Sequence, residues 1–107
     1  MANVSFVREK QRLTARLDGE IDHHSAQVLR EMIDAEVLMM TPLHLVLDFS
    51  GVTFMDSSGI GLILGRNTMM KVLGGSLKIA QPPRQILRIL KLAQIPVDLE
   101  NEEVKTR

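Results

Sequence analysis

Hydrophobic and polar positions alternate at the beginning of the chain in a way that is typical of paired strands. Residues 4–7 and 13–17 lie on either side of a polar turn at residues 9–11, and in the second stretch every other position is apolar. This pattern predicts a half-buried hairpin, which Gly19 closes.

The spacing of the apolar positions then becomes helical. Asp22 is a suitable N-cap, so we expect a helix that follows it, runs through about residue 38 and ends before Pro42. One face of this helix carries a continuous apolar stripe, which is the side expected to be buried. The stripe consists of Ala26, Leu29, Ile33 and Val37, with Val28 and Met32 beside it.

A buried strand and a second helix follow. Residues 43–49 (LHLVLDF) carry apolar side chains on both faces, as in a central strand that is covered on both sides. After a turn at residues 50–51 and a short extended segment, we expect a helix from Ser57 or Ser58 to residue 73, with Gly74 as its C-terminal stop.

The last expected elements are a strand at residues 76–80 and a helix that begins after Pro82 and Pro83. The residues beyond Pro96 fit either a final helix or a frayed end. The order of elements predicts a single α/β domain, with a mixed β-sheet and helices packed chiefly on one face. The third helix is expected to bury Ile86, Leu87 and Leu90 and to expose Arg84, Arg88 and Lys91.

Composition narrows the possible functions. The 107 residues include 13 basic and 13 acidic side chains, so there is no net charge to attract nucleic acid or an anionic membrane. The three aromatic residues are all phenylalanine, too few for a platform that stacks bases. The chain lacks cysteine, and its first residues lack the apolar core of a signal peptide, so we expect a cytoplasmic protein that binds no membrane.

The informative motif follows the buried strand and opens the second helix. Two hydroxyl groups lie there among unpaired backbone N–H groups at the positive end of the helix dipole, where a phosphate would find partners. The same residues also fit a simple helix cap, with glycines 59, 61 and 65 letting the helix approach the sheet. The motif consists of Asp56, Ser57, Ser58, Gly59, Ile60 and Gly61.

The second helix also begins with more apolar surface than a sheet requires. Residues 59–64 read GIGLIL, apolar on every side, although a helix that lies on one face of a sheet needs only a stripe. Either neighbouring elements bury this segment completely, or part of it forms a docking patch beside the serines.

The segment LHLVLDFSGVTFMDSSGIGLILGRNTMM, with RLDGEIDHHSAQVLRE before it, resembles the bacterial anti-sigma-factor antagonists of the STAS domain family, most of all their sporulation branch. The resemblance covers nearly the whole chain and implies one STAS domain over residues 1–107. It also implies that Ser58 is phosphorylated by the anti-sigma factor, a serine kinase that carries its own ATP and magnesium. Only the unphosphorylated form would bind that kinase and release sigma, and a serine phosphatase would restore it.

The resemblance implies a protein that is monomeric when free, needs no cofactor and is not an enzyme. In line with this, Asp56 and Met55 stand where a G-x-S-x-G nucleophile elbow needs glycine. Adjacent His23 and His24 cannot both face one metal from a helix, so we expect no metal site. The alternative that stays open is a module that binds a small nucleotide or anion at the start of the second helix.

Overall fold

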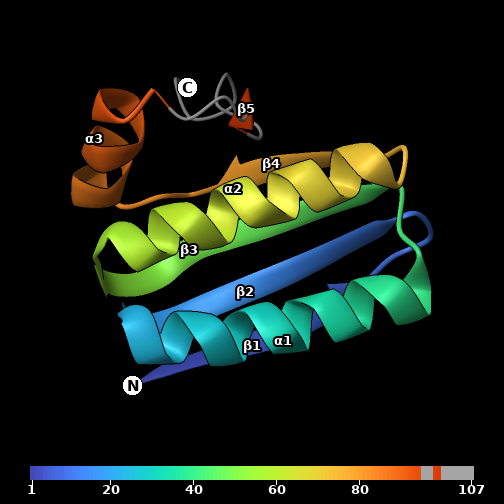
Figure 1. Ribbon diagram of the computed structural model, residues 1–107, viewed down its shortest axis with the longest axis horizontal. Coiled ribbons are helices and arrows are strands. Elements are labelled where there is room, and N and C mark those ends of the chain that lie inside the picture. Colours follow the sequence, from blue (N-terminus) through green and yellow to red (C-terminus); the bar gives the residue numbers. More distant parts are fainter. Residues whose placement is uncertain (95–97, 100–107) are drawn as a thin grey trace.

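The computed structural model describes residues 1–94 and 98–99. Its elements alternate between strand and helix after an initial pair of strands (Figure 1). In chain order they are β1 (Ala2–Arg8), β2 (Arg12–Ile21), α1 (His23–Met40), β3 (His44–Met55), α2 (Ser57–Val72), β4 (Ser76–Ala80), α3 (Arg84–Leu92) and β5 (Asp98–Leu99).

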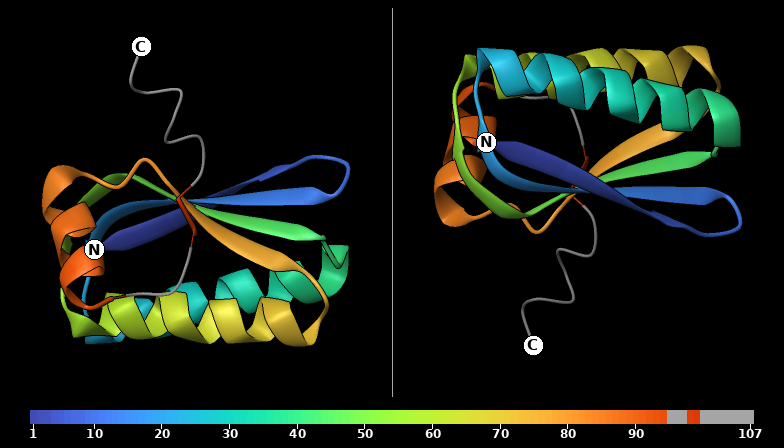
Figure 2. Two further views of the ribbon diagram at one scale, coloured as in Figure 1. Left: turned by 90° about the horizontal axis from the view of Figure 1, so that it is seen from above. Right: turned by 90° about the horizontal axis from the view of Figure 1, so that it is seen from below.

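The strands form one mixed sheet in the order β1-β2-β3-β4-β5. β1 and β2 form the expected antiparallel hairpin, and each later neighbour is parallel, with β3 in the centre. α1 packs on β1 and β2, while α2 packs on β3 and β4, so these two helices lie side by side on one face (Figure 2). The predicted α/β class and the one-sided placement of the main helices are confirmed.

The core lies between the sheet and the paired helices. The predicted stripe of α1 is buried in full, whereas Val28 and Met32 beside it are about half exposed. In β3, Leu45, Val46 and Leu47 are buried in succession, as expected of a central strand. Phe49 is completely buried at the end of this run. The apolar pattern of the sequence therefore identified the inner faces correctly.

One predicted break in the strands is wrong and another is right only in part. Gly19 closes the hairpin, since it is the last residue of β2 that pairs with β1, opposite Ala2, but β2 itself continues to Ile21 and Gly19 has a positive φ of 94° within it. The expected turn at residues 50–51 is absent, because β3 runs on to Met55. Register shifts between β2 and β3, after Arg16 and after Gly19, accommodate the extra residues as bulges. Glycines in this pair of strands thus mark bulges and not strand ends.

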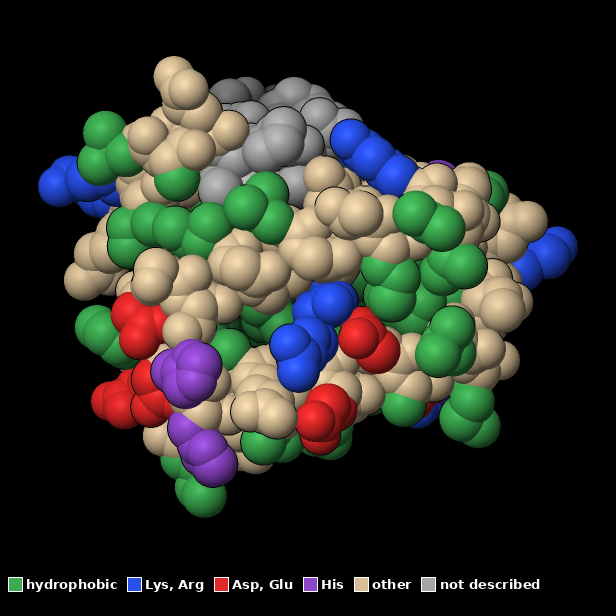
Figure 3. All heavy atoms as spheres, in the orientation of Figure 1, with side chains coloured by type: hydrophobic (Ala, Val, Ile, Leu, Met, Phe, Trp, Pro, Cys, Tyr) green, Lys and Arg blue, Asp and Glu red, His purple; other side chains and the backbone are tan. Residues whose placement is uncertain are grey.

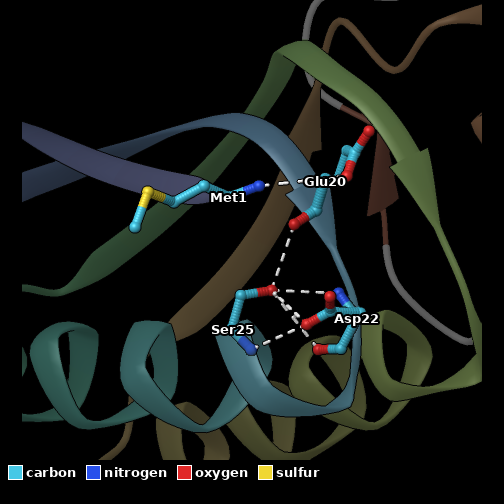
Figure 4. Close-up of polar contacts among 4 residues, drawn as sticks. All are labelled: Met1, Glu20, Asp22 and Ser25. Carbon is cyan, nitrogen blue, oxygen red and sulfur yellow. Dashed lines mark hydrogen bonds and ion pairs between the residues drawn. The ribbon is translucent and has the colours of Figure 1, made fainter.

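A capping box fixes the start of α1 (Figure 4). The Asp22 carboxylate accepts a hydrogen bond from Ser25 N at 2.9 Å, and Ser25 Oγ accepts one from Asp22 N at 2.9 Å. Ser25 Oγ also donates to the Glu20 carbonyl at 3.1 Å, which ties the helix to the end of β2. The predicted N-cap is confirmed, and the helix ends at Thr41, before Pro42, in a left-handed conformation with φ 47°.

The C-terminal elements agree with the sequence where the structure describes them. β4 has the predicted bounds, and α3 buries Ile86 and Leu90 while Leu87 is half-buried. Of the residues beyond Pro96, Asp98 and Leu99 pair with β4 as a short strand. The two alternatives for the rest of that segment lie outside the described residues.

Candidate functional site

The corner between β3 and α2 is held together by Asp56. Its carboxylate accepts a hydrogen bond from Ser58 N at 2.8 Å, and its carbonyl accepts one from Gly59 N at 3.0 Å. Asp56 N donates to the carbonyl of Ile21 at 3.2 Å, so the corner is also tied to β2. Asp56 is therefore the N-cap of α2, and the serines that follow lie in the first turn.

The two serines of the first turn differ in exposure. Ser57 is exposed, whereas Ser58 is half-buried because it lies on the side of α2 that faces α1. Both hydroxyl groups remain at the N-terminal end of the helix, where backbone N–H groups favour an oxyanion.

The three glycines of α2 do not share one role. A Cβ at Gly59 would lie 2.1 Å from Met55 Cγ, so this glycine is required for close packing on the end of β3. A Cβ at Gly61 or at Gly65 would meet nothing within 4 Å. The expectation that all three glycines let the helix approach the sheet is thus wrong for the last two, which border open space.

That open space is a groove of about 350 Å³ between α1 and α2. Figure 3 shows basic, acidic and histidine side chains gathered along the seam between these two helices. The α2 side of the groove starts at Ser58, so the groove begins at the predicted switch. Its lining consists of His23, Ala26, Gln27 and Arg30 from α1, with Ser58, Gly61, Leu62, Gly65 and Arg66 from α2.

Arg66 is the unusual residue of this groove, because only 8% of it is exposed. Its Nε lies 2.8 Å from Asp34 Oδ1, an ion pair that lacks the alignment of a hydrogen bond. Its Nη1 is buried and has no hydrogen-bond partner among the described residues. Burial lowers the pKa of the Arg66 guanidinium, Asp34 opposes that effect, and the nearby charge of Arg30 adds to it.

Arg66 and Arg30 are site residues that no motif in the sequence indicated. A signal was available, since Arg66 lies four residues after Leu62 and therefore on the same buried face of α2. An arginine on an apolar helix face needs a partner when it is buried.

The surplus apolar surface of α2 is only partly exposed. Leu62 and Ile63 are buried and Ile60 is half-buried, whereas Leu64 is 37% exposed. The exposure of Leu64 excludes complete burial of this segment, one of the two alternatives that the sequence left open. Leu64 shares the outer side of α2 with Ser57, at the spacing of two helical turns.

The histidines do not form a site among the described residues. His23 and His24 are exposed at the start of α1, and His44 hydrogen-bonds through Nδ1 to Ser76 Oγ at 2.8 Å. The part of the chain that the structure describes contains no group of three or more metal-ligating side chains. Within the same part, none of the helices has the length and apolar character needed to cross a bilayer.

Comparison with known proteins gives a consistent result. The model of the STAS domain family matches residues 4–102. The anti-sigma F factor antagonist of Paenibacillus polymyxa is 35% identical over 81 residues, which cover 76% of this chain and 69% of that protein. The anti-sigma-B factor antagonist of Bacillus subtilis (strain 168) is 32% identical over 90 residues, covering 84% and 81% of the two chains.

Solved structures show the same fold. The anti-sigma factor antagonist SpoIIAA in its unphosphorylated form superposes with a TM-score of 0.79 at 24% identity, covering 95% of this chain and 92% of that one. The Bacillus cell fate determinant SpoIIAA in the phosphorylated form gives 0.72 at 25% identity, with 98% of each chain covered. The latter protein therefore exists in a phosphorylated form with this fold.

Proposed function

We propose that this chain, which belongs to the STAS domain family and there to the anti-sigma factor antagonists, is an anti-anti-sigma factor. Serine phosphorylation controls it. In its unphosphorylated form it binds an anti-sigma factor and thereby releases the sigma factor. The partner is a serine kinase that brings its own ATP and magnesium, and a serine phosphatase reverses the modification. The whole chain acts as one cytoplasmic domain and as a substrate of its partner, not as an enzyme.

One observation supports this proposal above the others. Ser57 and Ser58 lie in the first turn of α2, and Leu64 is exposed two turns further along the same helix, on the side of Ser57. A hydroxyl that can receive phosphate and an apolar side chain that can contact a partner therefore lie on one side of α2. A change of charge at the serine would be felt by anything that docks there.

Phosphorylation adds about −1.5 to −2 charges to this corner. In the free protein the N-terminus of α2 stabilises that charge, although the Asp56 carboxylate beside it opposes the effect. In a complex the phosphate would also have to be desolvated against the partner, which favours the free state. A coupling of about 1 to 3 kcal/mol, typical of such switches, changes the affinity by up to about 150-fold without refolding.

The family resemblance points to Ser58 as the phosphorylated residue, while exposure favours Ser57, whose hydroxyl is the more accessible. We therefore propose Ser58 as the acceptor and treat Ser57 as the competing acceptor at the same corner. The surrounding Asp56, Gly59, Ile60 and Gly61 belong to the proposed docking surface.

The test is phosphotransfer. The protein is incubated with candidate anti-sigma kinases and labelled ATP, and the modified residue is mapped by mass spectrometry in the wild type, Ser57→Ala and Ser58→Ala. We expect transfer to be lost in only one of the two variants. Absence of transfer from every kinase that binds the chain would overturn the proposed switch, and label in both single variants would mean that either serine serves.

A further inference from the structure

The groove between α1 and α2 has no role in the switch as described so far. Leu62 forms a buried part of its lining, and Gly61 and Gly65 present bare backbone to it with open space where a side chain would be. A segment of another protein that enters the groove could therefore come close to the backbone of α2 at these two positions. The groove is a preformed hollow on the helical face.

A buried cation with an unused donor lies against this hollow. Arg66 is more than nine-tenths buried, yet its Nη1 has no hydrogen-bond partner among the described residues. A buried donor without a partner costs free energy, and more so on a charged group. Asp34 forms an ion pair only with the Nε side of the Arg66 guanidinium, where its Oδ1 lies 2.8 Å from Nε. Nη1 is itself covered, so an oxygen ligand in the groove would bind it after the guanidinium turns toward the groove.

A second guanidinium strengthens the preference for an anion. Arg30 lines the same groove from α1, and its charge lowers the pKa of Arg66, so the two cations are close enough to repel each other. Both remain charged at any physiological pH. An oxyanion between them would relieve that repulsion and could accept hydrogen bonds from both side chains.

We propose that this groove receives the carboxylate of an aspartate or glutamate on the anti-sigma partner, which is bound between Arg66 and Arg30. The proposal rests on the proposed function and names the chemistry of the partner's contact. A protein side chain is favoured over a free anion because the groove begins at Ser58, the residue proposed to control the partner. A carboxylate has two acceptor oxygens, one for each guanidinium.

The position of the groove also gives phosphorylation a second way to act. A phosphate on Ser58 would lie at the N-terminal end of the groove and carry the same sign of charge as the incoming carboxylate. It would repel that carboxylate and compete with it for the exposed Arg30. Release of the partner then follows from competition for cations as well as from desolvation.

The first test uses an anti-sigma kinase that has already been shown to phosphorylate this chain, so that the two proposals fail separately. Affinity for the unphosphorylated protein is measured for Arg30→Gln, for Gly65→Leu, which fills the groove, and for the control Arg84→Gln on α3. We expect the first two to weaken binding by about tenfold or more without lowering the melting temperature, Arg30→Gln through the loss of one charge-assisted hydrogen bond and Gly65→Leu by blocking the groove. The control Arg84→Gln should change the affinity by less than about twofold.

Wild-type affinity for both groove variants would overturn the proposed contact while leaving the phosphorylation switch intact. A charge reversal on both sides of the proposed contact tests whether binding can be restored. Arg30→Glu should abolish binding, and a lysine in place of one partner carboxylate should restore it. Failure of every such partner substitution to restore binding would also count against the contact.

A second test needs no partner. Sodium acetate is titrated against sodium chloride at equal ionic strength, and the side-chain N–H signal of Arg66 and the amides of Gly61 and Gly65 are followed by NMR. We expect saturable shifts with acetate that are lost in Arg30→Gln but retained in Arg84→Gln. Unchanged spectra would overturn the carboxylate site. Tight saturation by inorganic phosphate or ATP, with none by acetate, would assign the groove to a free anion and likewise overturn it.

Discussion

Gly59 lies so close to Met55 that a Cβ on residue 59 would be 2.1 Å from Met55 Cγ and 2.3 Å from its Sδ. The contact joins the first turn of α2 to the end of β3, and both residues are buried. Because Cγ is near the backbone, Met55 cannot make room by moving only its flexible end. The orientation of the serine-bearing turn therefore depends on the absence of a side chain at residue 59.

Gly59→Ala should consequently destabilise the protein even though alanine is the better helix former. Overpacking at such a site costs about 1 to 3 kcal/mol, more than the gain in helix propensity of about 1 kcal/mol. The free energy of unfolding, measured by urea denaturation, checks this. A variant as stable as the wild type would show that Met55 adapts at no cost.

Gly61→Ala and Gly65→Ala are matched controls with the opposite expected sign. Their Cβ atoms would enter open space, so only the gain in helix propensity remains, up to about 1 kcal/mol at each position. The same denaturation experiment should show both variants to be as stable as the wild type or more so. Destabilisation at either position would contradict the open groove.

The sequence predicted the elements well because their apolar periods are long and regular. The stripe of α1 and the alternation of β2 each repeat often enough to identify one buried face. The sequence predicted neither the continuation of β2 past Gly19 nor that of β3 past Gly51, since a glycine in a bulge has the same local signature as a glycine in a turn. What separates the two is the pairing of β2 with β3, which is distant in the sequence.

The capping box of α1 should make stability depend on pH. Hydrogen bonds from Ser25 lower the pKa of Asp22 below its ordinary value. Because the folded pKa is depressed, this carboxylate stabilises the protein above its unfolded pKa of about 3.9. The stabilisation is lost as the pH falls through the lower, folded value. We expect Asp22→Asn to have a lower melting temperature than the wild type at pH 7, and the difference to shrink in acid.

A hydrogen bond from Arg8 lowers the pKa of Glu36, so this carboxylate also loses its stabilising contribution in acid. Glu36 is present in the wild type and in Asp22→Asn, so the difference in melting temperature between these two proteins isolates the contribution of the cap. Melting curves from about pH 7 down to about pH 3 make the comparison. A difference that stays constant over this range would mean that Asp22 caps the helix without a contribution from its charge.

Charge at the proposed switch should affect binding far more than folding. Ser58→Ala should fold normally, resist phosphorylation and bind the anti-sigma partner constitutively, because a first-turn serine contributes a cap at most. Ser58→Asp should weaken partner binding by much more than it changes stability, since the helix dipole tolerates an acid that an interface must desolvate. The same pair at Ser57 tests the competing acceptor. Melting temperature and partner affinity are measured for all four variants.

Loss of partner binding in both alanine variants, with normal melting temperatures, would show that the hydroxyl groups themselves are needed for docking. Equal losses of stability and affinity in an aspartate variant would instead mean that the substitution unfolds the corner.

The site was harder to predict than the fold because its chemistry comes from two helices. Asp56 and the serines are adjacent in the sequence and could be recognised as a helix start. Arg66 and Arg30 meet only because α1 and α2 lie side by side on the sheet. The sequence places Arg66 on the apolar face of α2, but only the packed structure shows that it retains a buried donor without a partner among the described residues.

The outer side of α2 offers the sharpest test of where the partner docks. Leu64 is 37% exposed, while its neighbour Ile63 is completely buried, so the same substitution at adjacent residues should have opposite outcomes. Leu64→Asp should leave the melting temperature nearly unchanged and abolish anti-sigma binding, because an interface would have to desolvate the new charge. Ile63→Asp should unfold the domain, since it buries an unpaired charge in the core. Thr68→Asp, one turn further along the exposed side, measures how far the docking surface extends. If Leu64→Asp keeps full affinity and stability, the partner does not contact this side of α2, and the groove beside α1 becomes the surface to test.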